Sequence, residues 1–324
     1  MSFELILPFL RPIEPLLLDE SISEIMGNPD ASWWYERDGI IHREKTISFA
    51  AGKLRTGLEV IANQLGKRLD EDNPILHAQL PDGSRLAAVI PPVVRLTPAL
   101  IIRKFTSRHY TVDDLIARGT LTRPLADLLA EQIRNGKTLL ISGGTGTGKT
   151  TVLRVLANAI PEDQRIVVIE DTSELHIKKP NMLAVECQTD TFKANVTFDD
   201  LLKSALRWRP DRIILGEVRG IEARTLLDSL NTGHAGSLAT IHANSAEKAL
   251  HRFANLVMRN HAQSTFIDTE AEIAEAVDFI VHVERLPGHR VIREVLALRG
   301  YDRDAKRFQI ESVFASESTP QSLT

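Results

Sequence analysis

The residues best suited to chemistry lie in residues 141–160, which read ISGGTGTGKTTVLRVLANAI. Glycines there leave room for backbone N–H groups to converge on one ligand, and the helix-like run that follows would add the positive end of its dipole. A lysine directly after the last glycine can reach phosphate oxygens, and the threonine next to it can ligate Mg2+. The segment therefore predicts a site for a nucleoside triphosphate and its metal ion.

The loop fits the P-loop pattern G-x4-G-K-[ST], and the segments on either side of it fit the strand and the helix between which a P-loop lies. The apolar run TLLIS predicts a buried strand before it, and TTVLRVLANAI predicts a helix after it. No Asn/Thr-Lys-x-Asp signature for guanine follows, so we expect ATP, with Lys149 on the β- and γ-phosphates and Thr150 on Mg2+. The predicted nucleotide ligands are Gly143, Gly144, Thr145, Gly146, Thr147, Gly148, Lys149, Thr150 and Thr151.

Acidic residues follow two other runs that predict strands. The run IVVIEDTSEL reaches the end of its strand at Glu170-Asp171, with Glu174 in the loop beyond, and the strand within RIILGEVRG ends at Glu217. Because the carboxyl ends of parallel strands meet at one edge of a sheet, we expect these acids beside the P-loop. There they could hold Mg2+ through water or take a proton from an attacking water molecule, whereas the alternative is ordinary acids in solvated loops.

Two histidines lie in the segment TGHAGSLATIHANS, His234 in a glycine-rich turn and His242 at a predicted strand end. A zinc site would need further ligands, but no other Cys or His lies at ligand spacing, and the single cysteine, Cys187, is distant in sequence. We expect the histidines to sense the γ-phosphate or to couple it to a neighbouring subunit, with purely structural histidines as the alternative. We interpret Cys187 as a packed residue rather than a nucleophile, and a single cysteine excludes an internal disulfide.

The composition is that of a soluble globular chain long enough for two domains, with 324 residues, 43% hydrophobic and 25% charged. Its net charge of −4 gives no overall basic excess that would indicate nucleic-acid binding. The N-terminal run MSFELILPFLRPIEPLLLDE carries Glu4 where a signal peptide would carry a basic residue, and Pro8, Pro12 and Pro15 interrupt it. We expect a docking segment or short helices there, and no transmembrane segment.

Residues 1–106 predict a small α+β domain with an antiparallel sheet. The turn dipeptide Asp-Gly at 38–39 and the turn Pro-Asp-Gly at 81–83 each lie between strand-like runs, and the run between the two turns contains a stretch with helical spacing. A capping-box pattern, SISE at 21–24, predicts a short helix that ends near Gly27.

The rest of the chain has a different pattern of apolar residues. Residues 107–136 are charged and have helical spacing, and we expect them to form a linker with bridging helices. From 137 to 314, short apolar runs alternate with helical segments, which indicates strands buried on both faces and a mostly parallel α/β sheet. Residues 315–324 are rich in Ser, Thr, Pro and Gln, so we expect a disordered tail.

Four blocks in this order resemble one family. GGTGTGKTT, IEDTSEL, RPDRIILGEVRG and TGHAGSLATIHANS are similar to the secretion (traffic) ATPases of type II and type IV secretion, type IV pili and conjugation. The similarity covers about residues 75–315 and is greatest to the conjugal-transfer and type IV secretion subgroup. The resemblance implies a RecA-like P-loop NTPase domain preceded by the smaller N-terminal domain, and Mg2+-dependent ATP hydrolysis by a homohexameric ring.

The resemblance also implies roles for single residues. Glu174 matches the glutamate usually given the general-base role. The atypical Walker B motif ends at Glu217, and Gly216 stands where most P-loop ATPases have Asp, which leaves Glu217 as the residue expected to hold Mg2+ through water. Arg85 and Arg103 lie in segments similar to those that supply arginines to the nucleotide when subunits close, with surface salt bridges as the alternative.

Members of this family form rings at the cytoplasmic face of the inner membrane. The resemblance therefore implies a cytoplasmic, peripherally associated motor whose partners are secretion or conjugation apparatus proteins, without sequence-specific nucleic-acid binding. Two alternatives stay open. A DNA-translocating or helicase-type hexameric ATPase would need basic inward-facing loops, and RWRPDR at 207–212 is the local basic cluster. A nucleotide-switched scaffold would bind ATP with negligible hydrolysis, and the acids Glu174 and Glu217 argue against it.

Overall fold

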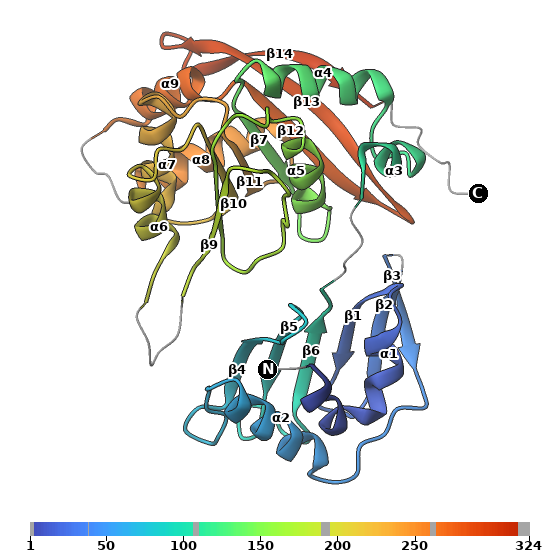
Figure 1. The fold of residues 1–324 in the computed structure, drawn as a ribbon. Helices are drawn as coiled ribbons and strands as arrows, with labels where there is room; N and C mark the ends of the chain where they lie inside the picture. The colour runs from blue at the N-terminus through green and yellow to red at the C-terminus, as the bar shows by residue number, and fades with distance from the viewer. Residues whose placement is uncertain (1–2, 38, 106–109, 189–194, 260–263, 317–324) are drawn as a thin grey trace. The chain divides into compact units, whose positions relative to one another are not determined.

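The computed structural model describes residues 3–37, 39–105, 110–188, 195–259 and 264–316. The chain divides into two compact units, Met1–His109 and Tyr110–Thr324 (Figure 1). Each unit has its own sheet, one antiparallel and one mostly parallel, and its own buried core. The fold is therefore α/β, as predicted.

The first unit is built on a six-stranded antiparallel sheet with the strand order β3-β2-β1-β6-β5-β4. Leu58 and Ile61 of helix α2 share one buried cluster with Ile25, Leu86 and Ile102 of the strands. Short helices precede the sheet, in agreement with one of the two expectations for the N-terminal run. The elements are η1 Phe3–Leu5, η2 Leu7–Phe9, η3 Arg11–Ile13, α1 Glu14–Leu18, β1 Ile22–Gly27, β2 Trp33–Arg37, β3 Ile40–Glu44, α2 Lys53–Gln64, β4 Ile75–Gln79, β5 Arg85–Val89 and β6 Ala99–Arg103.

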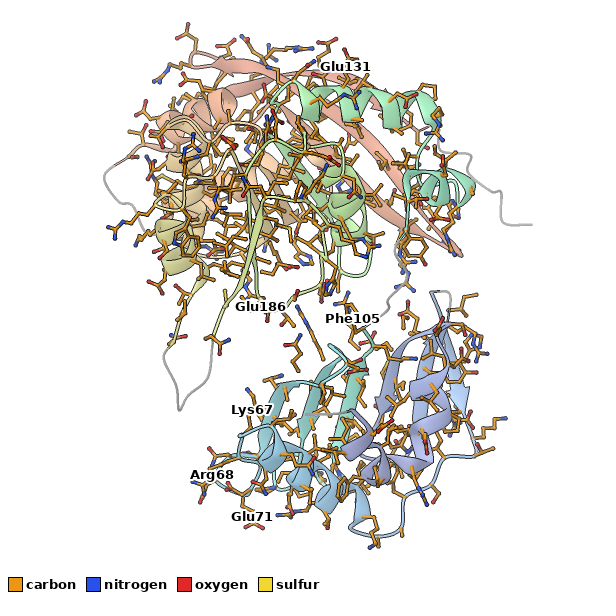
Figure 2. The ribbon with its side chains drawn as sticks, viewed as in Figure 1. Lys67, Arg68, Glu71, Phe105, Glu131 and Glu186 are labelled. Atoms are coloured by element: carbon orange, nitrogen blue, oxygen red, sulfur yellow. The ribbon has the colours of Figure 1, made fainter. Side chains whose placement is uncertain are left out.

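The predicted hairpin at 81–83 is confirmed, and its turn is held by residues that follow β6. Gly83 has a φ of +88°, and a Cβ added to it would lie 3.0 Å from the Phe105 ring, which Figure 2 labels. The Phe105 amide donates to the Ser84 hydroxyl at 2.9 Å, and that hydroxyl donates to Asp82 at 2.7 Å. Glycine therefore suits this turn both for its backbone angle and for the close aromatic ring.

The segment with the capping-box pattern is a strand, so the prediction of a helix there is wrong. Ile22–Gly27 form β1, which pairs with β2 on one side and β6 on the other. Ser21 donates its hydroxyl to Asp19 at 2.5 Å and accepts from Arg37 Nε at 3.0 Å, so it serves a turn instead of a helix cap. Two strand neighbours and the buried Ile25 outweigh a local cap signal, which is worth only about 1 kcal/mol.

The second unit contains an eight-stranded sheet with the strand order β14-β13-β12-β7-β11-β10-β8-β9. The strands from β12 to β9 in this order run parallel, whereas β13 and β14 extend the sheet antiparallel at one edge (Figure 1). This confirms the predicted mostly parallel sheet. The strands are β7 Leu139–Gly143, β8 Ile166–Glu170, β9 Met182–Glu186, β10 Arg212–Val218, β11 Leu238–His242, β12 Phe279–Leu286, β13 His289–Asp302 and β14 Arg307–Ala315.

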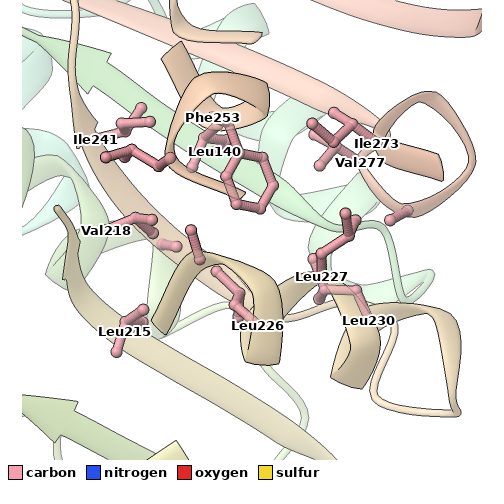
Figure 3. Close-up of a cluster of buried hydrophobic side chains, with 14 of the residues drawn as sticks. Leu140, Leu215, Val218, Leu226, Leu227, Leu230, Ile241, Phe253, Ile273 and Val277 are labelled. Atoms are coloured by element: carbon pink, nitrogen blue, oxygen red, sulfur yellow. The ribbon is translucent and has the colours of Figure 1, made fainter. Parts of the chain in front are cut away.

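Helices cover both faces of this sheet. Along β7 the side chain of Leu140 enters one buried cluster and those of Leu139 and Ile141 enter another, as the period of two in a strand requires. The first cluster contains residues of α6 to α9, among them Phe253 close to Leu140 (Figure 3), and the second contains residues of α3 to α5. The helices are α3 Val112–Ala117, α4 Arg123–Arg134, α5 Lys149–Ala157, α6 Phe198–Ala205, α7 Glu222–Asn231, α8 Ala246–Met258 and α9 Phe266–Ala276.

The structure describes most of the predicted linker, 107–136, and the start of the predicted tail, 315–324. Within 107–136 the chain forms α3 and α4, whose buried Leu115 and Leu129 belong to the core of the second unit. Strand β14 runs to Ala315, and the remainder of the predicted tail, 317–324, lies outside the described residues. Among the helices that the structure describes, none has the length and apolar character needed to cross a bilayer.

Candidate functional site

A glycine-rich loop at residues 143–150, called the glycine loop below, joins the end of β7 to helix α5. Gly143 lies against strand β12, where an added Cβ would come within 2.3 Å of the Val283 carbonyl oxygen. Gly148 has a φ of +92°, a left-handed conformation that favours glycine. These two positions therefore require glycine for the shape of the loop itself.

Helix α5 presents amides without a side-chain cap to this loop. Its N-cap residue, Gly148, has no side chain, and the helix start has no side-chain cap hydrogen bond. A Thr or Ser hydroxyl caps each of five other helices in the unit, namely α3, α4, α6, α8 and α9. Thr147 fixes the loop by donating its hydroxyl to the Gly144 carbonyl at 3.0 Å. The start of α5 therefore suits an anion such as a phosphate.

The remaining predicted ligands of the loop are at least partly accessible to solvent. Thr145 is exposed, and Gly146, Thr150 and Thr151 are half-buried. Thr150 and Thr151 belong to the first turn of α5, directly after the lysine. Both threonines therefore lie in the turn whose amides suit a phosphate.

The Lys149 ammonium is buried at the centre of the site, with the residue 7% exposed. Its Nζ donates to the carbonyl oxygens of Gly143 at 3.1 Å and Gly144 at 2.7 Å, and it lies 3.4 Å from Nδ1 of His242. An ammonium can only donate, so Nδ1 of His242 must accept, and the ring carries its proton on Nε2. The lysine therefore fixes the tautomer of the histidine.

His242 connects this lysine to Glu217. It ends β11, where its Cα is paired with that of Gly143 in β7, and its Nε2 lies 3.5 Å from Oε1 of Glu217. Partial burial and the nearby Lys149 charge hold the pKa of His242 below its usual range, so the ring is neutral at pH 7. The structure thus brings three predicted site residues, Lys149, His242 and Glu217, together at the carboxyl edge of the sheet.

A β-bulge in β10 positions Glu217. The pairing with β11 shifts between Leu215 and Val218, so Gly216 and Glu217 together oppose the single residue Thr240. The Thr240 hydroxyl donates to the Gly216 carbonyl at 2.5 Å and holds the bulge in place. We expected a regular strand end at Glu217, although a glycine inside a strand-like run is a known signal for a bulge.

Glu170 is a buried acid that the sequence marks only as a strand end. It is 4% exposed, and its Oε1 accepts hydrogen bonds from the amides of Glu174 and Leu175, both at 2.9 Å. Burial raises the pKa of Glu170 to about 7, although the two amide hydrogen bonds act in the opposite direction. A Cβ added to Gly216 would lie 3.4 Å from Cγ of Glu170, so an aspartate there would bring a second carboxylate against this buried one.

The segment after β8 is also held to the end of β10. Arg219 donates to Asp171 at 2.8 Å, and its guanidinium lies 5.1 Å from the centre of the Phe198 ring. Glu174 lies half-buried in this segment, with its amide bonded to Glu170. The backbone that carries Glu174 is therefore fixed at both ends, while the role of its carboxylate stays a prediction.

His234 lies at the other end of β11 from His242. Its Nδ1 is 3.1 Å from the Pro210 carbonyl oxygen, near the amino end of β10. The strand between the two histidines spans about 13 Å, at about 3.3 Å per residue. The structure therefore does not bring His234 to the glycine loop of its own chain.

Arg212 belongs to the basic cluster RWRPDR, but it is 4% exposed. Its guanidinium donates to Oε1 of Gln164 at 2.7 Å and to the carbonyl oxygens of Ile133 and Ala235, each at 3.3 Å. A Cβ added to Gly236 would lie 1.2 Å from this guanidinium, so the glycine makes room for it. The cluster therefore offers one arginine fewer to a nucleic acid than its sequence suggests.

Arg85 and Arg103 lie in the first unit and face each other. They are direct Cα partners in the β5–β6 pair, and their neighbours Leu86 and Ile102 are buried in the core. Because side chains alternate along a strand, both arginines lie on the sheet face away from that core. The structure brings these two predicted residues together, and their role toward a nucleotide stays a prediction.

Known proteins are similar to this chain over most of its length. The family model described as type II/IV secretion system protein matches residues 10–299. A relative described as a probable conjugal transfer protein, TrbB of Sinorhizobium fredii, is 37% identical over 300 residues, which cover 91% of this chain and 88% of the relative. The match therefore extends over both units.

Two solved structures are similar over nearly the whole chain. The VirB11 ATPase from the Brucella suis type IV secretion system, in complex with sulphate, has a TM-score of 0.50 and 28% identity and covers 90% of this chain and 93% of its own. The pilus retraction motor PilT with bound ADP has a TM-score of 0.66 over 91% of this chain and 84% of its own, at 20% identity, which indicates a shared fold. With its glycine loop, its buried lysine and a family match over most of its length, this chain belongs to the type II/IV secretion system protein family, a family of ATPases.

Proposed function

We propose that this chain hydrolyses ATP with Mg2+ as a homohexameric ring, and that it powers type IV secretion or conjugative transfer. The observation that carries the proposal is the contact of Lys149 with His242 and of His242 with Glu217 beside the glycine loop. Such a set belongs to a RecA-like P-loop domain, in which the loop binds phosphate and strand-end residues act on it. The named relatives, a conjugal transfer protein and a type IV secretion ATPase, support the role.

The glycine loop would bind the triphosphate through its own amides and those of the first turn of α5. Lys149 would exchange its bonds to the Gly143 and Gly144 carbonyls for phosphate oxygens. The lysine would then pair its positive charge with negatively charged oxygens in place of neutral carbonyl oxygens, so the exchange favours the bound state.

Thr150 and Glu217 would hold Mg2+, Glu217 through water. This donor set fits the ion, because Mg2+ prefers oxygen ligands and usually binds to one or two carboxylates together with substrate phosphates. In the part of the chain that the structure describes, no group of three or more His, Cys, Asp or Glu side chains could hold a metal ion. Phosphate oxygens would therefore complete the coordination, and the ion would neutralise charge on the β- and γ-phosphates.

Glu174 would take the proton of the attacking water. Glu170 fixes the backbone of this residue through its hydrogen bond to the Glu174 amide. His242, neutral and with its Nε2 proton toward Glu217, would respond to a γ-phosphate at Lys149, because a change in the lysine contact changes what its Nδ1 accepts.

Arg85 and Arg103 would complete the site from the first unit as subunits close. A pair of guanidinium groups on one sheet face can bind developing phosphate charge. Because the arginines would reach the nucleotide only on closure, their binding would couple closure to hydrolysis. His234, which lies away from the glycine loop of its own chain, would couple the site to a neighbouring subunit. The ring would lie at the cytoplasmic face of the inner membrane, with secretion or conjugation apparatus proteins as its partners.

The test removes the buried ammonium. We expect Lys149→Ala to abolish Mg2+-dependent phosphate release from ATP while the circular dichroism spectrum and the hexameric mass stay those of the wild type. The matched control is Lys137→Ala, at the other end of β7, where a half-exposed lysine pairs with Asp278 at 2.9 Å. Exposed ion pairs are worth about 1 kcal/mol or less, so the control should keep nearly full turnover.

Full turnover in Lys149→Ala would refute the site. A wild-type protein that binds ATP but releases no phosphate would favour the nucleotide-switched scaffold instead. Turnover that rises severalfold with single-stranded DNA would favour the DNA translocase. A mass other than that of six chains, measured by native mass spectrometry with nucleotide present, would refute the ring.

A further inference from the structure

The hairpin of β12 and β13 carries two arginines that the predicted site does not include. A two-residue turn, Pro287-Gly288, joins the strands, and Gly288 has a φ of +79°. Arg285 and Arg290 are direct Cα partners across this hairpin. Residues directly opposite in an antiparallel pair extend to the same face, so the short turn places two guanidinium groups side by side.

Both arginines lie against the glycine loop. Arg290 donates its Nε proton to the Gly146 carbonyl at 3.1 Å. A Cβ added to Gly148 would lie 3.1 Å from Cδ of Arg290, and one added to Gly146 would lie 3.4 Å from Nη1 of Arg285. Two glycines of the loop therefore leave room for arginines of the same chain as well as for phosphate.

The arginines and the histidine approach the loop from opposite sides. Strand β7, which leads into the loop, lies between β11 and β12 in the sheet. His242 at the end of β11 contacts Lys149 on one side, while Val283 of β12 pairs with Gly143 on the other and leads to Arg285. A triphosphate whose terminal group binds at Lys149 and His242 therefore has its nucleoside end available to the β12 side.

We propose that Arg285 and Arg290 bind the nucleoside end of the nucleotide, with their guanidinium planes against the base. The proposal rests on the proposed function, because it requires a nucleoside triphosphate in the glycine loop. Arginine suits the task, since its planar, delocalised and weakly hydrated cation stacks on aromatic faces while its remaining N–H groups keep other bonds. Every base offers such a face, so this contact predicts tight binding with little preference between bases.

The experiment separates the base from the phosphates. ADP and inorganic tripolyphosphate, each with Mg2+, are titrated into the full-length protein and followed by calorimetry. The double variant Arg285→Ala/Arg290→Ala should bind ADP about tenfold more weakly, the effect of losing cation–π contacts of ordinary strength. Its affinity for tripolyphosphate should stay within about twofold of the wild type. The matched control is Arg299→Ala, farther along β13, where an exposed arginine pairs with Glu311, and it should change neither affinity.

A second variant distinguishes stacking from support of the loop. Arg290→Lys keeps a cation able to donate to the Gly146 carbonyl but loses the planar group. We expect it to bind tripolyphosphate as the wild type does and ADP more weakly. If the double variant lost equal affinity for ADP and for tripolyphosphate, the arginines would support the loop or bind phosphate, and the proposal would be overturned. Unchanged affinity for ADP in the double variant would overturn it as well. Failure of the proposed function is distinct, because then Lys149→Ala would leave both affinities unchanged.

Discussion

Replacing Glu170 by glutamine tests whether burial raises the pKa of this carboxyl and so makes the stability of the protein depend on pH. The Glu170→Gln variant keeps a carbonyl oxygen to accept from the amides of Glu174 and Leu175, each 2.9 Å from Oε1, but it cannot ionise. In the native protein the residue is 4% exposed, and burial raises the pKa of the carboxyl from an ordinary 4.5 to about 7. The variant therefore removes the titration and keeps the hydrogen bonds.

The sign and size of the effect follow from this pKa. A carboxyl with a raised pKa in the folded state binds its proton more tightly there, so its contribution to stability is complete below pH 4.5 and is lost as the pH rises through about 7. A rise from 4.5 to about 7, at about 1.4 kcal/mol per pH unit, amounts to about 3 kcal/mol. We expect Glu170→Gln to match the wild type near pH 5 and to exceed its free energy of unfolding by up to about 3 kcal/mol at pH 8.

The assay is urea unfolding at pH 5, 6, 7 and 8, followed by circular dichroism, on wild type and variant in parallel. The control is Glu131→Gln, on the exposed side of α4 (Figure 2), which should leave the pH dependence of stability as it is in the wild type. The difference between the variant and the wild type should grow from pH 5 to about pH 7 and level off toward pH 8, where the carboxyl is ionised in both the folded and the unfolded chain. A constant difference across this range would refute the reasoning, because the carboxyl would then titrate alike in the folded and unfolded chains.

Two further predictions concern packing around the site. Gly143→Ala should lower the thermal midpoint by several degrees and abolish turnover, because the new Cβ would meet the Val283 carbonyl oxygen at 2.3 Å, whereas Gly144→Ala, whose Cβ would lie 3.6 Å from its nearest neighbour, should keep the midpoint nearly unchanged. Equal midpoints for the two variants, by scanning calorimetry, would contradict this. The Cys187 thiol is 8% exposed and burial raises its pKa to about 11, so a thiol reagent at pH 8 should label it only as urea unfolds the chain, and immediate stoichiometric labelling would show the thiol to be accessible.

The parallel sheet could be predicted because local sequence and burial agree there. The runs that form β7, β8, β10, β11 and β12 are nearly continuous in apolar residues, as strands covered on both faces must be. The segment 21–27 was predicted wrongly because its strand partners, β2 and β6, lie elsewhere in the chain. A capping pattern reports only on its own few residues, and it contains no information about which strands will lie beside them.

The residues of the site likewise fall into those that a local motif predicts and those that depend on contacts between distant segments. The glycines and Lys149 form a contiguous motif, so the sequence alone could name them as ligands. The contact of Arg290 with Gly146 spans 144 residues and depends on β12 pairing with β7, and the burial of Glu170 depends on β9 and β10 on either side of it. Register between distant strands decides such contacts, and no local pattern in a single sequence encodes it.

The buried Arg212 has a consequence for how the second unit can move. Its three hydrogen bonds tie the end of α4, the segment before β8 and the turn before β11 to the start of β10, so the amino-terminal rim of the sheet is locked together. Bending there would break several of these bonds at once and leave a buried cation without acceptors, a cost of several kcal/mol. The structure therefore resists bending at the amino-terminal rim of the sheet, while the glycine loop and its neighbouring side chains lie at the opposite rim.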